Sequence, residues 1–388
     1  MHQTQAHHIA LVLTTIHIPT VLEAYREQAG CGSSGKISTI VVGDLKSPAT
    51  TEEYLKSLHT DDFPVHYLDV ERQNEWMKRH QALGDFIPFN SVQRRNVGFL
   101  YAANLGCDII ISIDDDNHPL PEHDYFRDHG IIGTFLEAES VYSNTGWFNT
   151  CSLLEISSPR TVYHRGFPLK MRREEIHRFE TERRRVVVNV GLWLGDPDVD
   201  TIARMEGPLR VEKVREPRDR ILLGSGTMAP FNSQNTAFST ELLPCMFLIA
   251  LNRGTPLLGN NNFRYDDIWM SFFLKKIVDH MGDAVCVGPP HVEQRRNPHD
   301  MKLDLAKEQL PLQLTDKLID YLEKISLSKL TYSDCYRELI DKLGTLVRSA
   351  SDLVKEEREL FENMLEGMKL WAEAAGEYVK HCHHGTKR

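Results

Sequence analysis

Three consecutive aspartates, Asp114 to Asp116, are the residues of this chain that most constrain its chemistry. They follow an isoleucine-rich run at residues 109–113, which is typical of a central strand in an α/β sheet. Ligands of such sheets bind at the carboxyl ends of the strands, so we expect the aspartates to lie at that edge. Adjacent carboxylates raise one another's pKa values unless a cation neutralises them. Oxygen ligands suit Mg²⁺ or Mn²⁺, and a divalent ion that carries a diphosphate is the simplest occupant.

An acidic loop that only caps the next element is the alternative explanation, because acidic triplets are common on protein surfaces. The position directly after a hydrophobic strand favours the metal site. We therefore predict that Asp114 and Asp116 bind the metal, and that Asp114 and Asp115 contact a bound nucleotide.

The length and composition indicate one large α/β domain with a smaller attachment. With 388 residues the chain exceeds the usual size of a single domain, and we place a catalytic domain at residues 1–305 and a helical extension at 306–388. Hydrophobic residues make up 41% and charged residues 26%, as in an ordinary soluble globular protein. The net charge of −10 argues against nucleic acid as the main partner.

Targeting and cysteine signals are weak. No apolar stretch approaches the roughly 20 residues that cross a bilayer, and the amino terminus lacks the features of a signal peptide, so we expect a cytoplasmic protein. The seven cysteines are scattered without a CxxC pair, which suggests neither a disulfide framework nor a zinc site.

The elements that must position the aspartates alternate between strand and helix. We expect strands at residues 8–16, 37–42, 65–70 and 108–113, and helices at 19–28 and 92–105. This alternation predicts a mainly parallel sheet. The loops that contain Thr15 and Asp44 follow strand ends and are candidates to hold a base and ribose. Asp44 is equally well explained as a turn or helix cap.

Further along, residues 186–194 and 284–287 read as strands, and residues 242–251 and 267–281 as helices. The sequence becomes charged and helix-favouring from about residue 303. There one apolar stripe recurs at helical spacing, formed by Leu353, Leu360, Met364, Trp371, Ala375 and Tyr378. The stripe is expected to pack on the catalytic domain or on another subunit, which would make the protein a homo-oligomer. Residues 381–384 resemble a metal site, but a chain end lacks the outer shell that orients ligands.

Several segments together resemble the reversibly glycosylated polypeptides, the UDP-arabinopyranose mutase family, whose fold is of the GT-A glycosyltransferase type. The resemblance covers about residues 8–305. It rests on the segments IDDD at 113–116, RGFPL at 165–169, GLWL at 191–194, PDVD at 197–200, NTAF at 235–238 and RYDDIW at 264–269.

Two arginines in these segments, Arg165 and Arg172, are candidate catalytic residues. They would lie two turns apart on a helix or at the two ends of a loop, and two guanidiniums that face a carboxylate triplet could clamp a diphosphate. A solvated basic face is the alternative. Gly166 suggests a fixed turn that holds Arg165. The resemblance implies that Arg165 is the reversibly glycosylated residue and that Arg172 is essential.

Asp266 and Asp267 precede a predicted helix and could simply cap it. The resemblance implies instead that they contact sugar hydroxyls or act as a base. It also makes His291 a candidate third metal ligand, although a histidine in a proline-rich turn is often only a loop residue. The residues that we assign to the nucleotide are Thr15, Asp44, Arg95, Asp114, Asp115, Trp193 and Asn235.

The resemblance implies a nucleotide-sugar enzyme, with a UDP-sugar as substrate and Mn²⁺ or Mg²⁺ as cofactor. In the mutase version the sugar returns to the nucleotide in another ring form, and in the transferase version it passes to a small-molecule or saccharide acceptor. A non-catalytic scaffold would not need paired charges at a strand end. Ser233 replaces a glycine typical of the family, and residues 260–263 are rich in asparagine, so the walls of the pocket and hence the sugar could differ.

Overall fold

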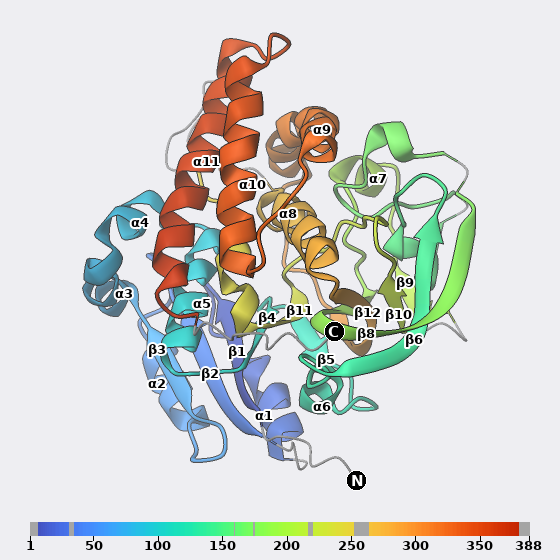
Figure 1. Ribbon diagram of the computed structural model, residues 1–388. Coiled ribbons are helices and arrows are strands. Elements are labelled where there is room, and N and C mark those ends of the chain that lie inside the picture. The colour runs from blue at the N-terminus through green and yellow to red at the C-terminus, as the bar shows by residue number, and fades with distance from the viewer. Residues whose placement is uncertain are drawn as a thin grey trace.

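The computed structural model describes residues 7–30, 35–158, 160–173, 175–215, 220–251 and 264–379. The asparagine-rich residues 260–263 and the histidine-rich residues 381–384 lie outside the described residues. Helices pack around one large mixed sheet (Figure 1). None of the described helices is long and apolar enough to cross a membrane, and the cytoplasmic location stays a prediction.

Four parallel strands in the order β3-β2-β1-β4 form one half of the sheet. Their bounds are β1 (His8–Thr14), β2 (Lys36–Val42), β3 (Val65–Leu68) and β4 (Ile109–Ile113). The helices in this half are α1 (Leu22–Gly30), α2 (Thr51–Leu58), α3 (Val70–Met77), α4 (Gln81–Phe86) and α5 (Arg95–Asn104). Residues on both faces of β4 are buried, which explains its continuous run of isoleucines. The predicted α/β class is confirmed, with parallel strands throughout this half of the sheet.

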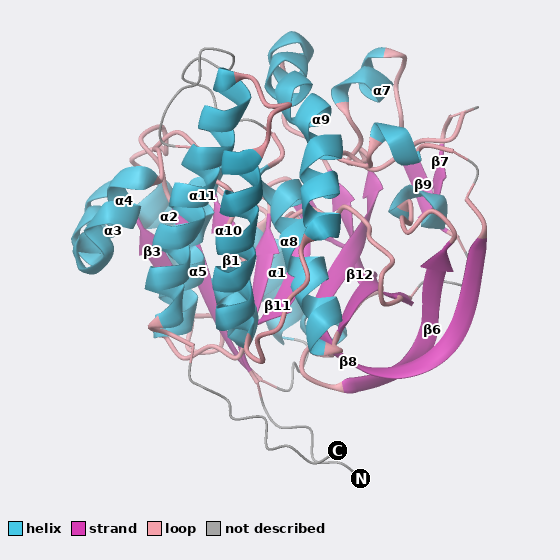
Figure 2. Cartoon of the chain, turned by 45° about the horizontal axis from the view of Figure 1, so that its top comes forward, coloured by secondary structure: helices cyan, strands magenta, loops and turns pink. Residues whose placement is uncertain are grey.

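Beyond β4 the sheet becomes mixed, because β11 (Asn235–Ser239) joins β4 in the antiparallel direction. The other strands are β5 (Asn117–Pro119), β6 (Phe135–Ser143), β7 (Leu154–Ile156), β8 (His177–Gly195), β9 (Val211–Val214), β10 (Ile221–Leu223) and β12 (Ala284–Gln294). Strands β6 and β8 form a long curved ribbon at the side of the molecule (Figure 2). β8 also pairs with β11 and β12, so the ribbon continues into the centre of the sheet.

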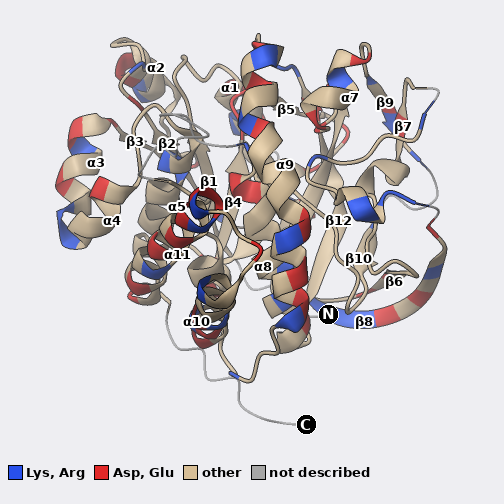
Figure 3. Cartoon of the chain, turned by 90° about the horizontal axis from the view of Figure 1, so that it is seen from above, with Lys and Arg blue, Asp and Glu red and all other residues tan. Residues whose placement is uncertain are grey.

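The remaining helices are α6 (Tyr125–His129), α7 (Thr201–Met205), α8 (Asp266–Met281), α9 (Met301–Lys324), α10 (Tyr332–Ser349) and α11 (Lys355–Gly376). Of these, α8, α10 and α11 lie together on one face of the sheet (Figure 2). Helix α8 is buried along most of its length, whereas α9, α10 and α11 carry charges of both signs on their outer faces (Figure 3). The three carboxy-terminal helices therefore cover α8. The boundary at residue 305 stays a prediction.

The predicted apolar stripe packs against the rest of the chain, which was one of the two predicted arrangements. Leu360, Met364 and Trp371 are buried on α11. The indole of Trp371 stacks on Phe247 with ring centroids 5.5 Å apart, and its Nε1 donates to the carbonyl oxygen of Leu243 at 3.0 Å. This face is thus part of the common hydrophobic core. The predicted homo-oligomer remains a separate prediction.

The prediction of a helix at residues 242–251 is wrong. A short 3₁₀ helix covers Thr240–Cys245 and contains Pro244, which has no N–H to continue a helix. The residues that follow are buried without helical bonds. The side-chain amide of Asn96 bonds to the backbone of Leu248 in this segment. Its Oδ1 accepts from the N–H of Leu248 at 2.9 Å, and its Nδ2 donates to the carbonyl oxygen of Leu248 at 2.7 Å.

Candidate functional site

The aspartate triplet lies where the sequence predicts, directly after β4 and beside the end of β1. Thr15 Oγ1 donates to Asp115 Oδ2 at 2.5 Å, and Arg95 Nη2 donates to Asp114 Oδ1 at 2.5 Å. The backbone N–H of Asn297 donates to Asp116 Oδ2 at 3.2 Å. The side chain of Asp114 is 36% exposed, so a ligand can reach it.

The triplet carries more negative charge than its bonded partner neutralises. Among the described residues, Arg95 is the cation that bonds to it, against three carboxylates. Burial, and next the charge of Asp114, raise the pKa of Asp116 to about 7. A divalent ion would relieve this excess, and Mg²⁺ is commonly held by one or two carboxylates together with phosphates and water. Two carboxylates can supply donors for such an ion, and the metal at Asp114 and Asp116 stays a prediction.

His291 does not complete a ligand set with these aspartates. Its ring packs edge-on against His123 with centroids 4.5 Å apart, and burial lowers its pKa to about 4. Within the described part of the chain, no three His, Cys, Asp or Glu side chains are arranged to hold a metal ion. We correct the assignment of His291, because this residue lies within β12 and its ring packs against His123.

Asp44 has the capping role that the sequence left open. Its carboxylate accepts from the backbone N–H groups of Leu45 at 2.7 Å, Asn90 at 2.8 Å and Ser91 at 3.0 Å. These bonds hold the loop before α5. Asp44 thus organises the rim of the site through backbone contacts.

Two other residues assigned to the nucleotide lie inside the core. The Oδ1 atom of Asn235 accepts from Tyr125 and His129, and its Nδ2 donates to the carbonyl oxygens of Leu192 and Pro290. An amide has no further strong bonds to offer, so Asn235 has none left for a nucleotide. Trp193 is 1% exposed and its ring packs edge-on against a buried histidine, His164. Both assignments are corrected, because the sequence does not reveal which face of a strand is covered.

Arg165 is buried in a cage of acceptors. Its Nε and Nη2 donate to the two oxygens of Asp198 at 2.8 and 3.0 Å. Its Nη1 and Nη2 donate to the two oxygens of Asp267 at 3.3 and 3.5 Å, and Nη1 also donates to the carbonyl oxygen of Arg264. All five N–H donors are therefore used within the protein. Burial alone would lower the pKa of Arg165, but the charges of Asp198 and Asp267 raise it well above its usual value.

Gly166 fixes the turn that presents Arg165. Its φ of +81° lies in the left-handed region, and a Cβ there would approach Ile268 Cγ2 to 2.1 Å. Only glycine allows this loop to lie against the start of α8. The predicted fixed turn is confirmed, and it brings Arg165 beside Asp267.

Arg172 lies at the other end of the same loop. Of the two predicted arrangements, the one at the two ends of a loop is therefore confirmed, and the one two turns apart on a helix is not. Its Nη2 donates to Asp200 Oδ2 at 2.7 Å, and its guanidinium lies over the ring of Tyr163 at 5.1 Å. The prediction that both arginines face the triplet is wrong. Their carboxylate partners come from the loop after β8 and from α8. A pocket of about 340 Å³, lined in part by Arg172 and Asp200, opens beside them.

The two aspartates that begin α8 differ. Asp267 binds Arg165 and accepts from the backbone N–H of Ser233 at 3.1 Å. Asp266 is buried, and burial followed by the charge of Asp267 raises its pKa to about 7. Both aspartates lie in the first turn of the helix. Asp267 can therefore favour the helix dipole and bind Arg165 at the same time.

Ser233 joins the arginine cage to the triplet. Arg95 Nη1 donates to the carbonyl oxygen and to Oγ of Ser233, both at 3.2 Å, while Ser233 Oγ donates to Asp267 at 3.4 Å. A continuous polar chain results. It runs through Asp114, Arg95, Ser233, Asp267, Arg165 and Asp198.

Sequence reasoning missed Asp198 and Ser233 as parts of the site. Asp198 stood in the quoted PDVD segment without a role, and Ser233 was noted only as a departure from the family. The sequence feature that could have indicated Asp198 is the pair Asp198 and Asp200, which follow the strand predicted at residues 186–194. Nothing local pointed to the bonds of Ser233, because its partners are distant in sequence.

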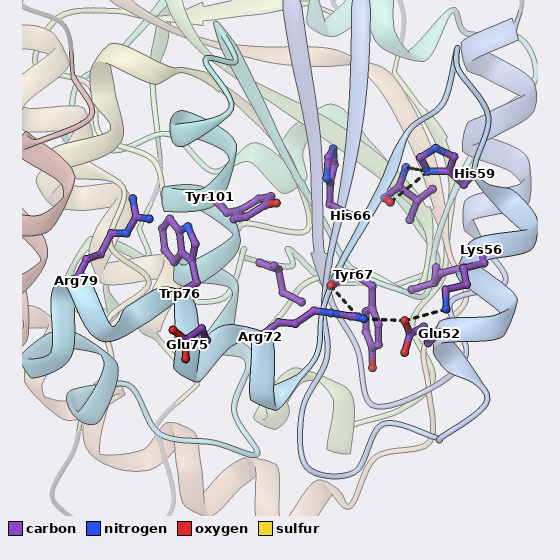
Figure 4. A pocket seen from close by; sticks show the side chains of 13 residues that line it. Glu52, Lys56, His59, His66, Tyr67, Arg72, Glu75, Trp76, Arg79 and Tyr101 are labelled. Atoms are coloured by element: carbon purple, nitrogen blue, oxygen red, sulfur yellow. Dashed lines mark hydrogen bonds and ion pairs between the residues drawn. The ribbon is translucent and has the colours of Figure 1, made fainter.

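A separate hollow lies at the outer edge of the sheet (Figure 4). Its volume is about 750 Å³, and strand β3 with helices α2 and α3 forms most of its wall. Trp76, Tyr101 and Arg72 line it, but none of the residues of the polar chain does. The hollow is thus distinct from the candidate site.

Comparison with known proteins identifies the family of this chain. The family model described as reversibly glycosylated polypeptide matches residues 67–378. Probable UDP-arabinopyranose mutase 4 of Arabidopsis thaliana is 26% identical over 68% of this chain and 66% of its own length. UDP-arabinopyranose mutase 3 of the same plant is 31% identical over 54% and 52%.

The matched region thus spans about half to two thirds of these curated relatives. The solved structure of S. aureus TarS 1-349 in complex with UDP-GlcNAc aligns with 96% of this chain and 80% of that protein, at 12% identity and a TM-score of 0.33. The family model covers most of the sequence, including the triplet, both arginines and the start of α8. The chain therefore belongs to the reversibly glycosylated polypeptide family.

Proposed function

We propose that this protein binds a nucleoside diphosphate sugar, in the first instance a UDP-sugar, and breaks and re-forms its sugar–diphosphate bond. The observation that carries this proposal is the polar chain, which connects an under-neutralised triplet at a strand end to a caged arginine. The names of the mutase relatives support the substrate class. The product would be the same nucleotide with its sugar in another ring form.

The triplet would hold the diphosphate end of the substrate. A divalent Mn²⁺ or Mg²⁺ ion on Asp114 and Asp116 would stabilise the charge that develops on the leaving diphosphate. Arg95 orients Asp114, and Thr15 orients Asp115. Such prearranged charges usually supply the largest part of rate enhancement.

Arg165 would receive the glycosyl group in the mutase version. A guanidinium held between Asp198 and Asp267 is protonated, and a protonated nitrogen is a poor nucleophile. As the anomeric carbon leaves the diphosphate oxygen and bonds to Nη1, that nitrogen would lose a proton, for which the nearby Asp267 is the acceptor. The sugar ring would open and reclose while the sugar is on Arg165. Attack of the diphosphate on the anomeric carbon, with return of the proton to Nη1, would then restore the nucleotide sugar in another ring form.

A glycosyltransferase that passes the sugar to a separate acceptor is the second candidate. The pocket beside Arg172 favours it, because it is lined by hydroxyl groups and by charges of both signs. Arg160 and Glu206 form an ion pair of 2.7 Å among its lining residues. This composition suits a neutral polyhydroxyl acceptor.

Purified protein incubated with a panel of nucleotide sugars and Mn²⁺ tests the proposal. We expect mass spectrometry to find one added sugar on the peptide that contains Arg165, together with isomerised nucleotide sugar. Arg165→Lys keeps the charge but loses the planar fork, so it should abolish both. Absence of an adduct, with transfer to an added saccharide, would support the glycosyltransferase. Failure to bind or convert any nucleotide sugar would reject both candidates.

A further inference from the structure

Arg296 is placed beside the triplet by its two neighbours in the chain. The backbone N–H of Arg295 donates to the carbonyl oxygen of Asp116 at 2.9 Å, and that of Asn297 donates to Asp116 Oδ2 at 3.2 Å. The side chain of Asn297 also donates to Asp115 Oδ1 at 3.2 Å. The segment after β12 is thus bonded to the triplet on both sides of Arg296.

The guanidinium of Arg296 is only partly neutralised. Its Nη1 lies 3.4 Å from Asp196 Oδ1, the same oxygen that accepts from Arg204 Nη1. Two guanidiniums on one carboxylate leave one positive charge in excess. Arg264 adds no surplus, because it is paired with Asp304 and with Glu308.

Arg296 has donors to spare. Within the described part of the chain, the contact with Asp196 is the one hydrogen bond that its side chain makes, although a guanidinium has five N–H donors. The side chain is 13% exposed, so part of it is accessible to solvent. Arg165, by contrast, has every donor occupied.

Electrostatic effects agree with this geometry. Burial, followed by the charges of Arg204 and Arg264, lowers the pKa of Arg296. An anion held between Arg296 and a divalent ion on the triplet would meet positive charge from both sides.

We infer that Arg296, rather than Arg165, binds the diphosphate of the nucleotide, with Arg204 as its partner across Asp196. This inference rests on the proposed function, since it names the group that recognises the phosphates of that substrate. Arginine suits the role because its planar fork can bond two phosphate oxygens at once. Arg165 is then free to act on the sugar.

Calorimetry with UDP and with uridine, each in the presence of Mn²⁺, tests the inference. We expect Arg296→Gln to weaken UDP binding by tenfold or more, the usual scale for losing charge-assisted bonds, and to leave uridine binding unchanged. Arg296→Lys should give an intermediate loss for UDP. Arg295→Gln is the matched control, because that side chain is 62% exposed and paired with Glu293. It should change neither affinity.

Three results would overturn the inference. The first is equal UDP affinity in Arg296→Gln and the parent. The second is an equal loss of UDP and uridine affinity in that variant, which would show general damage to the site. The third is an equal loss of UDP affinity in Arg295→Gln, which would show only a long-range charge effect. A parent protein that binds UDP no better than uridine would instead reject the proposed function.

Discussion

The two ends of the polar chain are built in different ways. At one end, two carboxylates enclose Arg165, and each of its N–H donors has an acceptor inside the protein. At the other end, Arg95 bonds to Asp114, while Asp115 and Asp116 accept from neutral donors, and Asp114 is 36% exposed. The first end is closed and satisfied, whereas the second is open and carries excess charge.

This difference indicates that the closed end holds a fixed geometry, whereas the open end can bind a ligand. A buried ion pair whose donors are all used holds one geometry, and it has no bonds left for an incoming phosphate. An exposed group of like charges is costly until a counter-ion arrives, so it favours binding. We therefore place the diphosphate at the triplet and Arg296, and the sugar at Arg165. Substitutions at each end should then have different consequences.

The largest effect on stability is expected at the closed end. Asp198 is 3% exposed and binds Arg165 through two hydrogen bonds, so Asp198→Ala would leave a buried guanidinium with half of its charge partners. Breaking one side of such a pair costs about 3–5 kcal/mol. Urea unfolding, followed by circular dichroism, measures the loss.

The exposed pair of Arg160 and Glu206 provides the control, since these side chains are 70% and 52% exposed. Glu206→Ala should lower the free energy of unfolding by no more than about 1 kcal/mol. If the two variants were equally stable, Arg165 would not be held by Asp198 in solution.

The second effect depends on pH and concerns Asp266, which is buried beside the cage. Its pKa is raised from 3.8 to about 7 by burial, so between these values the folded state binds a proton that the unfolded state releases. The free energy of unfolding should then fall by about 1.4 kcal/mol per pH unit as the pH rises through this window, and level off above it.

Asp266→Asn cannot ionise, so it should gain stability relative to the parent as the pH rises. We expect the two proteins to have almost the same free energy of unfolding near pH 4, and to differ by up to about 4 kcal/mol at pH 8. This value is the slope per pH unit multiplied by the width of the pH window. Urea unfolding of both proteins at several pH values gives the difference directly. A difference that does not change with pH would mean that Asp266 has an ordinary pKa.

The sequence predicted the open end better than the closed one, for a physical reason. The triplet follows a strand whose isoleucines mark its burial on both faces, so the position and chemistry of Asp114 were readable locally. The cage depends on a loop, on the strand β8 and on the start of α8, which meet only in the folded sheet. Asn235 was misassigned for the same reason, because its partners lie on two strands and a helix. Periodicity predicts elements, but it does not predict which side chains share a cage.

The third prediction concerns the metal at the open end. Asp116→Asn removes a charged ligand and should weaken binding of UDP-sugar in the presence of Mn²⁺ by tenfold or more, which is about 1.4 kcal/mol. Folding should survive, because the change relieves repulsion within the triplet. Calorimetry with and without MnCl₂ measures the effect, and the exposed Asp62 supplies Asp62→Asn as a control. Unchanged metal dependence in Asp116→Asn would remove Asp116 from the metal site.

The smallest effect is expected where the two ends meet, at Ser233. Ser233→Ala removes the hydroxyl that bonds Arg95 at 3.2 Å and Asp267 at 3.4 Å, but it keeps the backbone bonds to the same two residues. The loss of stability should therefore be near 1 kcal/mol, the usual net value of a hydrogen bond. Combining Ser233→Ala with Asp198→Ala in a double-mutant cycle asks whether the chain acts as a unit. Because Asp267 and Arg165 link the two sites, we expect a coupling energy of at least about 0.5 kcal/mol in urea unfolding. Additive losses would show that the triplet and the cage are energetically independent, and that Ser233 only fills the space between them.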